Sequence, residues 1–399
     1  MKDKLRLKSL TEYFAVLMII ISSGSVFFVI KNCEATLFTL LASAILVAIC
    51  GKISVKTLKK NFAIFVIILA AVFFNLAVNW QYSVYDKDLI ILLIRMTSLL
   101  IIQSTIEQDK FIKKYVEILV VLAALSLLLF SYTMLINQEL PGIIHDGYDF
   151  TFYHTTGHGY FYTRNSGIFW EAPAHSVFLN IALCMLSCRK ELFSDEYFKY
   201  AIILAVTIIS TLSVFAFVCL AINILIMWKT SKKHIKQNKL VSKNSSRLRF
   251  WIIILCVVLF MALVVVELKY QIISHKLINK KGSYNTRFND TLFTIQLALK
   301  RPLTGFGIFN NYTTEVLKSM NVVNNSNGLA VFIMDMGIIL SVLGIGWIVW
   351  QQRKLYKVKW DVYILVLALL FLYHFSEHLW LFTLFISMLF SWKKEKYKS

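Results

Sequence analysis

Long apolar segments separated by short basic loops constrain this chain more than any other feature of its sequence. A membrane-spanning helix needs about 20 mostly apolar residues, and stretches of this kind recur along the 399 residues. They lie at 12–30, 35–51, 62–80, 89–106, 115–136, 173–188, 251–267 and 327–350. Because 58% of the residues are hydrophobic and only 16% are charged, no soluble domain of ordinary size is left over. The sequence predicts an all-α polytopic membrane protein, with a single integral membrane domain over 1–399.

Two further apolar stretches, 200–228 and 361–392, have basic residues at both ends. Cytoplasmic loops are enriched in Lys and Arg, so both ends of each stretch are expected on the cytoplasmic side. That requires two crossings, and each stretch is predicted to form a hairpin. The total becomes about twelve membrane helices with both termini in the cytoplasm. The net charge of +20 then orients the chain in the membrane, and no nucleic-acid partner is predicted.

Two outer loops remain, the first at 137–172 and a longer one at 268–326. The first is rich in aromatic and histidine residues, and tyrosine and tryptophan faces suit sugar rings. An interfacial aromatic belt is the alternative reading of Trp170. Arg164 is the only Lys or Arg in the sequence of this loop, and it lies close to Glu171. A simple ion pair between the two is the alternative to a functional role for Arg164.

The second outer loop carries an excess of basic residues, which indicates an anionic partner. Lipid headgroups are the alternative to a substrate. Arg287 lies in a stretch predicted to form an amphipathic helix that a glycine-bearing turn follows. Gly305 and Gly307 free the backbone there for a tight turn or for the close approach of a ligand. Arg95 and Asp335 are ionisable residues within predicted membrane segments. Such residues commonly have a functional role, and pairing of polar groups between helices is the alternative.

Three sequence blocks, in order, resemble a known family. "RNSGIFWEAPAHSVFLNIAL" resembles the Arg-x-x-Gly-x-Phe-x-Glu-Pro stretch that enters a membrane helix in bacterial O-antigen polymerases and ligases. "RFND" followed by "LALKRPLTGFGIFNN" is similar to their Arg-bearing helix and Pro-x-x-Gly-x-Gly turn. "SNGLAVFIMDMGIIL" is similar to their His-Asn entry into the next helix.

Two departures from the family pattern bear on function. Ala172 separates Glu171 from Pro173, so the Glu-Pro pair is interrupted. Ser326 stands where the ligases carry their essential histidine, while Asn327 is retained. The resemblance therefore favours a polymerase over a ligase that transfers the glycan to lipid A core. A flippase of lipid-linked sugars is the alternative from another class.

The resemblance implies undecaprenyl-pyrophosphate-linked glycans as donor and acceptor, membrane lipids and a chain-length regulator as partners, and transfer at the periplasmic face of the bacterial inner membrane. Guanidinium groups suit the negative charge on a departing pyrophosphate, and a carboxylate or imidazole can take the proton of the attacking hydroxyl. The expected substrate-binding residues are Arg164, Arg287, Lys300, Arg301, Trp170 and Asn327. The candidate bases are Glu171, His154, His158 and His175. No Asp-x-Asp sequence lies in an outer loop, so no metal or other cofactor is predicted.

Overall fold

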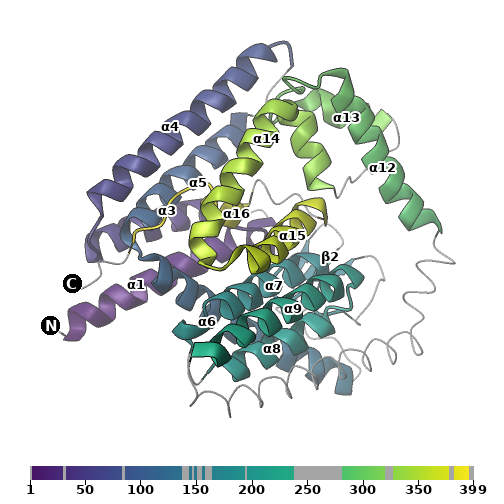
Figure 1. Ribbon diagram of the computed structural model, residues 1–399. Helices are drawn as coiled ribbons and strands as arrows, with labels where there is room; N and C mark the ends of the chain where they lie inside the picture. Colours follow the sequence, from purple (N-terminus) through teal and green to yellow (C-terminus); the bar gives the residue numbers. More distant parts are fainter. Residues whose placement is uncertain are drawn as a thin grey trace. The chain divides into compact units, whose positions relative to one another are not determined.

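The computed structural model describes residues 2–29, 33–82, 86–136, 143–145, 148–150, 155–157, 164–193, 196–237, 281–319, 327–376 and 382–394. These parts of the chain are helical apart from short connections and one small sheet (Figure 1). The predicted span at 251–267 lies outside the described residues. The helices of the first half are α1 (Lys2–Ile21), α2 (Val26–Val29), α3 (Cys33–Cys50), α4 (Val55–Val78), α5 (Asp86–Thr105), α6 (Gln108–Ile136) and α7 (Ala172–Cys188). After a 3-10 turn at Lys190–Leu192 come α8 (Tyr197–Ser210), α9 (Val214–Gln237), α12 (Lys281–Lys300), α13 (Asn311–Ser319), α14 (Gly328–Tyr356), α15 (Trp360–Ser376) and α16 (Thr383–Ser387).

Five of the described helices are long and apolar enough to cross a membrane. They are Cys33–Cys50, Val55–Val78, Lys87–Thr105, Gln108–Ile136 and Gly328–Tyr356. Shorter apolar helices occupy Ala172–Cys188, Tyr197–Ser210, Val214–Thr230 and Trp360–Phe375. The chain is therefore a multi-pass helical membrane protein, and the count of twelve crossings stays a prediction.

The apolar stretch 200–228 forms two helices, as the basic residues at its ends predict. α8 ends at Ser210 and α9 begins at Val214. Between them Thr211 turns its hydroxyl back to the carbonyl of Ile208 at 2.7 Å, and Leu212 has a positive φ of 46°. A local side-chain hydrogen bond of this kind competes with helix continuation, so the break is built into the sequence.

Two of the predicted spans are wrong in detail. The span at 12–30 is interrupted, because α1 ends at Ile21 and the Ser-Ser-Gly-Ser run follows it. Gly24 has a φ of 93°, a conformation that glycine adopts without strain. The predicted second arm of the 361–392 hairpin is helical only over Thr383–Ser387 among the described residues 382–394. There the chain leaves the helix, and the Lys393 amide bonds to the Gln103 carbonyl at 2.9 Å.

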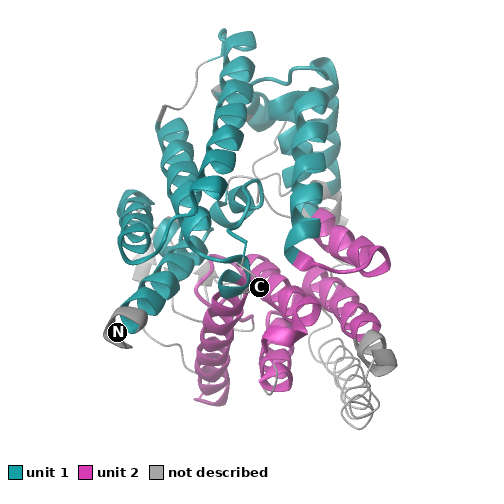
Figure 2. Cartoon of the chain, turned by 60° about the vertical axis from the view of Figure 1, so that its left-hand side comes forward, with its two compact units in different colours: residues 1–111, 282–355, 373–399 teal, residues 112–281, 356–372 magenta. Residues whose placement is uncertain are grey.

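The chain divides into two compact units (Figure 2). Unit 1 comprises 1–111, 282–355 and 373–399, and within it α3 packs against α1 and α5 while α4 packs against α5. Unit 2 comprises 112–281 and 356–372, and its central helix is α7, which packs against α8 and α9. Nearly every residue of α7 is buried. The single membrane domain over 1–399 stays a prediction.

A small antiparallel sheet lies within the predicted first outer loop, and it is the exception to the all-α prediction. Its strands are β1 (Ile143–His145), β2 (Tyr148–Phe150) and β3 (Thr155–Gly157), in the order β1-β2-β3. In the register, Ile143 pairs with Phe150 and Tyr148 pairs with Gly157. A meander of this kind needs only local turns, so it can form within a loop.

Candidate functional site

The Pro-x-x-Gly-x-Gly turn lies against a break in α14. The backbone of Gly337 is non-helical, with φ 75° and ψ 167°, so the amides and carbonyls around it lose helical partners. The turn supplies replacements: the Phe306 amide donates to the Met334 carbonyl at 2.9 Å and the Gly307 amide to the Asp335 carbonyl at 3.0 Å. In return the Ile338 amide donates to the Pro302 carbonyl at 2.7 Å. Broken helices in membrane proteins persist where protein satisfies the freed groups.

Glycine is required on both sides of this contact. A Cβ on Gly305 would lie 2.4 Å from the Asp335 carbonyl oxygen, and one on Gly337 would lie 2.4 Å from that of Leu303. Both residues have positive φ, at 64° and 75°. The turn that Gly305 and Gly307 predict is confirmed, and its partner in α14 is a finding of the structure.

Asn75 on α4 fixes the turn and the broken helix together. Its side-chain amide donates to the carbonyls of Thr304 at 2.9 Å and Asp335 at 3.2 Å. Its side-chain oxygen accepts from the Ile308 amide at 2.8 Å. One helical turn later Asn79 donates to the Asn75 carbonyl at 2.8 Å and to Thr304 at 3.4 Å. Asn75 therefore ties α4 to both the turn and the broken helix, and Asn79 adds a longer contact to the turn.

Asn75→Ala is expected to destabilise the protein by about 2–4 kcal/mol, because three hydrogen bonds are lost and the buried Ile308 amide loses its acceptor. The melting temperature of purified protein in detergent measures the effect. Asn79→Ala is the matched control, and we expect less than half the loss because the Asn79 side-chain oxygen has no hydrogen-bond partner among the described residues. Equal losses in the two variants would contradict this account.

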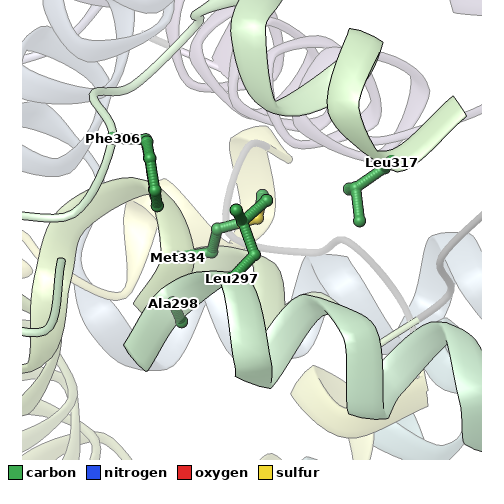
Figure 3. Close-up of a cluster of buried hydrophobic side chains, with 5 residues drawn as sticks. All are labelled: Leu297, Ala298, Phe306, Leu317 and Met334. Atoms are coloured by element: carbon green, nitrogen blue, oxygen red, sulfur yellow. The ribbon is translucent and has the colours of Figure 1, made fainter. Parts of the chain in front are cut away.

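A hydrophobic cluster attaches α12 and α13 to the turn and the first part of α14 (Figure 3). Leu297 and Ala298 come from α12, Phe306 from the turn, Leu317 from α13 and Met334 from α14. All of them are buried. Burial of apolar surface from these four segments holds α12, the turn, α13 and the first part of α14 together.

Arg301 lies at the start of the turn among aromatic rings. Its guanidinium carbon is 5.6 Å from the ring centroid of Tyr82 and 5.8 Å from that of Phe306. Tyr82 also stacks on Tyr312 with the centroids 4.7 Å apart. Nη1 of Arg301 is buried and has no hydrogen-bond partner among the described residues. Aromatic faces stabilise a guanidinium without using its hydrogen-bond donors, so the contacts with Tyr82 and Phe306 leave Nη1 as an unused donor among the described residues.

The other predicted residues of the second loop are in different surroundings. Lys300 is exposed beside Arg301 at the end of α12. Arg287 belongs to α12, which confirms the predicted helix, but its side chain lies outside the described residues. Asn327 caps α14, since its side-chain oxygen accepts from the Ala330 amide at 3.0 Å. Its amide also reaches the Thr291 hydroxyl of α12 at 3.5 Å, so Asn327 joins two helices of unit 1.

Asp290 is a carboxylate that the sequence did not single out as a base. It is buried on α12, and burial raises the pKa of its carboxyl. A raised pKa is the direction that a general acid or base of neutral pH requires. Among the described residues no group of three or more His, Cys, Asp or Glu side chains gathers as a metal site.

In unit 2 the first motif block forms a tight turn before α7. Asn165 is fully buried and holds this turn through its side chain. Its amide donates to the hydroxyls of Ser126 at 3.2 Å and Ser210 at 3.0 Å, and its oxygen accepts from the Gly167 amide at 3.0 Å. Arg164 donates from Nη2 to the Leu212 carbonyl at 2.9 Å. The arginine at the head of the motif is thereby tied to the break between α8 and α9.

His175 packs against this turn and is buried. Its Nδ1 is 3.4 Å from the Asn165 carbonyl, and its ring stacks on Phe169 at 5.5 Å. Gly167 has a φ of 54°, and a Cβ there would lie 2.6 Å from the imidazole. The imidazole therefore supports the fold of the turn, and its catalytic role stays a prediction.

The remaining residues of the first block lie at the start of α7. Glu171 is half-buried in extended backbone just before the helix, and Pro173 follows in its first turn. Proline is suited to that position because its missing amide would have no helical partner. Trp170 is 39% exposed. An exposed indole is needed both to stack on a sugar ring and to belong to an interfacial aromatic belt, so the exposure agrees with both readings. His154 and His158 lie outside the described residues.

Asn165→Ala is expected to lower the free energy of unfolding by about 2–4 kcal/mol, because it breaks three side-chain hydrogen bonds in a buried turn. Ser126→Ala removes one of these partners, so we expect about 1 kcal/mol from it. Thermal unfolding of the two purified variants measures the difference. The proposed role of Asn165 fails if the serine variant is as unstable as the asparagine variant.

The intramembrane charges have structural neighbours. Arg95 is buried, its Nη2 is 3.5 Å from the Ser22 carbonyl, and its guanidinium carbon is 4.7 Å from the Phe28 centroid. Asp335 is buried on α14 just before the break at Gly337. Both residues belong to unit 1.

Sequence reasoning missed Asn75, Asn79, Tyr82 and Asn165. The asparagines were visible as polar side chains within or beside long apolar runs, and such residues in membrane helices are commonly conserved for function or packing. Tyr82 gave no signal, because nothing in one sequence links it to Arg301. Comparison with family models, curated proteins and solved structures finds no match for this chain.

Proposed function

We propose that this protein is a membrane glycosyltransferase that polymerises undecaprenyl-pyrophosphate-linked oligosaccharide repeat units into O-antigen. The observation that carries the proposal is the contact between two of the three motif blocks. The turn at 302–307 and the break of α14 at 334–338 are hydrogen-bonded to each other, and Arg301 stands at the start of that turn with a buried donor that no described residue accepts.

The proposed reaction is a transfer of the growing glycan. The acceptor hydroxyl oxygen bonds to the anomeric carbon of the donor, and the bond from that carbon to the pyrophosphate oxygen breaks. The electron pair leaves with the pyrophosphate, where Arg301, Lys300, Arg164 and Arg287 are the proposed partners of the developing charge. The hydroxyl proton passes to a base, for which Glu171 is the first candidate and His154, His158 and His175 follow. Trp170 and Asn327 are proposed to contact the glycan side of the site.

The setting of this reaction belongs to the same proposal. The chain would lie in the bacterial inner membrane with both termini in the cytoplasm and the outer loops 137–172 and 268–326 in the periplasm. Donor and acceptor would both be lipid-linked, and a chain-length regulator would bind the assembly. The multi-pass helical fold provides the membrane location that these substrates need.

The test is a gel of surface lipopolysaccharide from a strain deleted for this gene and complemented with variants. We expect the deletion to leave a core carrying one repeat unit, wild type to restore a ladder, and Arg164→Ala and Arg287→Ala to fail. Lys359→Ala is the matched control, because this lysine is exposed between α14 and α15. A full ladder from both arginine variants would argue against the proposed site.

The same gel separates the alternatives. A bare core with long lipid-linked chains would indicate a ligase. Absence of any repeat from the outer face would indicate a flippase, and the break in α14 favours this second candidate, since discontinuous helices form the binding sites of many transporters. Transfer of radiolabelled repeat units by purified protein in lipid vesicles would then decide between transport and polymerisation.

Removal of divalent cations is expected to leave transfer unchanged. The proposed chemistry uses guanidinium groups for the pyrophosphate charge, so a metal has no assigned step. The measurement is transfer by purified, lipid-supplied protein with and without a chelator. Loss of transfer that added magnesium or manganese restores would contradict this prediction.

A further inference from the structure

Unit 1 contains an apolar cavity of about 430 Å³ that the proposed reaction does not use. Its walls come from α4, α5, α14, the end of α15 and the segment through α16. Buried side chains form its inner part, among them Val72, Met96, Met336 and Phe385. The cavity is therefore formed within one unit, by helices that include three of the candidate membrane spans.

The outer part of the cavity opens onto membrane-facing surface. Ile67 on α4 and Leu343 on α14 both line it, and these side chains are 66% and 64% exposed. Both helices are among the candidate spans. In a bilayer, exposed apolar residues of a spanning helix face the hydrocarbon chains of lipids. A lipid chain can thus reach the cavity without passing through water.

The chemistry of the lining excludes water as a stable occupant. Trp347 and His374 are the lining residues that carry polar side-chain atoms. The indole of Trp347 already donates to the Leu389 carbonyl at 2.8 Å, and the His374 ring lies edge-on to Phe385 at 5.0 Å. A buried water needs two to four polar partners, and apolar cavities stay dry and accept apolar ligands.

The size of the cavity matches one long hydrocarbon chain. An apolar cavity of roughly 150 Å³ holds benzene, which has six carbon atoms. A volume of 430 Å³ is about three times larger, so it holds on the order of 18 carbon atoms. We propose that this cavity binds one acyl chain of a bilayer phospholipid. An undecaprenyl chain is several times too long to be enclosed, and the proposal does not depend on the proposed glycosyl transfer.

Photo-crosslinking tests the site in the full-length protein. Membranes containing the protein are supplied with a phosphatidylethanolamine that carries a diazirine in a C16 acyl chain, and labelled peptides are identified by mass spectrometry. We expect labelling within 64–72 and 340–348 in the wild type. Gly344 lines the cavity, and a Cβ there would meet only the Phe332 ring at 3.6 Å and beyond. Gly344→Leu should fill the cavity and reduce the labelling of 64–72 by about tenfold.

Gly346→Leu is the matched control, since Gly346 is on the same helix, does not line the cavity, and has nothing within 4 Å of an added Cβ. Its labelling should stay within about twofold of the wild type. Ala71→Trp fills the cavity from α4 and guards against a folding defect specific to α14. The proposal is overturned if both filling variants label like the wild type, or if an excess of undecaprenyl phosphate, but not of phospholipid, abolishes the labelling.

Discussion

Gly337→Ala is expected to destabilise the protein by about 3 kcal/mol or more and to abolish polymer formation. The residue has φ 75° and ψ 167°, a region that is essentially restricted to glycine. An added Cβ would also lie 2.4 Å from the Leu303 carbonyl oxygen and 2.7 Å from the Gly305 amide nitrogen. These are backbone atoms, so no side-chain rotation relieves the contact. The melting temperature in detergent and the lipopolysaccharide ladder of the complemented strain are the two measurements.

Gly346→Ala controls for the helical context. It lies nine residues further along α14 and has open space around the position of a Cβ. Alanine is favoured over glycine in a helix by up to about 1 kcal/mol, so we expect equal or greater stability. If Gly337→Ala melts and polymerises like this control, the break in α14 contributes nothing to fold or function.

Arg301→Ala is expected to reduce polymerisation by about 100- to 1,000-fold, the loss that follows removal of one donor to a developing negative charge. The reason is the buried Nη1, whose hydrogen-bonding capacity no described residue uses, beside the turn through which one motif block contacts another. Arg301→Lys keeps the charge but loses the planar fork, so it should recover only part of the activity. Transfer of labelled repeat units by purified protein provides the rate.

For Arg301→Ala, a loss of activity must be distinguished from a loss of folded protein. Tyr82→Phe retains the ring that stacks on Tyr312 and faces the guanidinium, and it is expected to leave the rate within about threefold of the wild type. The melting temperature of Arg301→Ala should stay within a few degrees of the wild type. A folded Arg301→Ala protein with a normal transfer rate would remove Arg301 from the proposed site.

The length of the apolar runs and the basic residues that flank them predicted much of the helical framework. The basic residues around 200–228 predicted the division into α8 and α9, and the apolar run at 35–51 predicted α3. Run length failed at 12–30, where the short polar run after Ile21 ends the helix although the surrounding residues are apolar. It failed again after Ser387, where α16 ends and the Lys393 amide further along donates to the Gln103 carbonyl. The first failure has a local cause in the polar run, whereas the second involves a contact between segments far apart in the chain.

The candidate site was predictable only in its local parts. Gly305 and Gly307 predicted a turn, because glycine permits backbone that other residues avoid. That the turn meets Gly337 and Asn75 could not be predicted, since these contacts join segments far apart in the chain and a single sequence carries no record of such pairs. His175 was selected for its chemistry, and its burial against Gly167 could not be predicted from the sequence; its role as a base stays a prediction.

The exchange of backbone hydrogen bonds between the turn and α14 has an evolutionary consequence. Each segment supplies what the other lacks, so 302–307 and 334–338 form one unit although they are separate in sequence. An insertion or deletion in either segment would shift its amides away from the carbonyls of the other. Lengths of both segments should therefore be fixed among orthologues, and glycine replacements at 305 and 337 should be rare and should occur together.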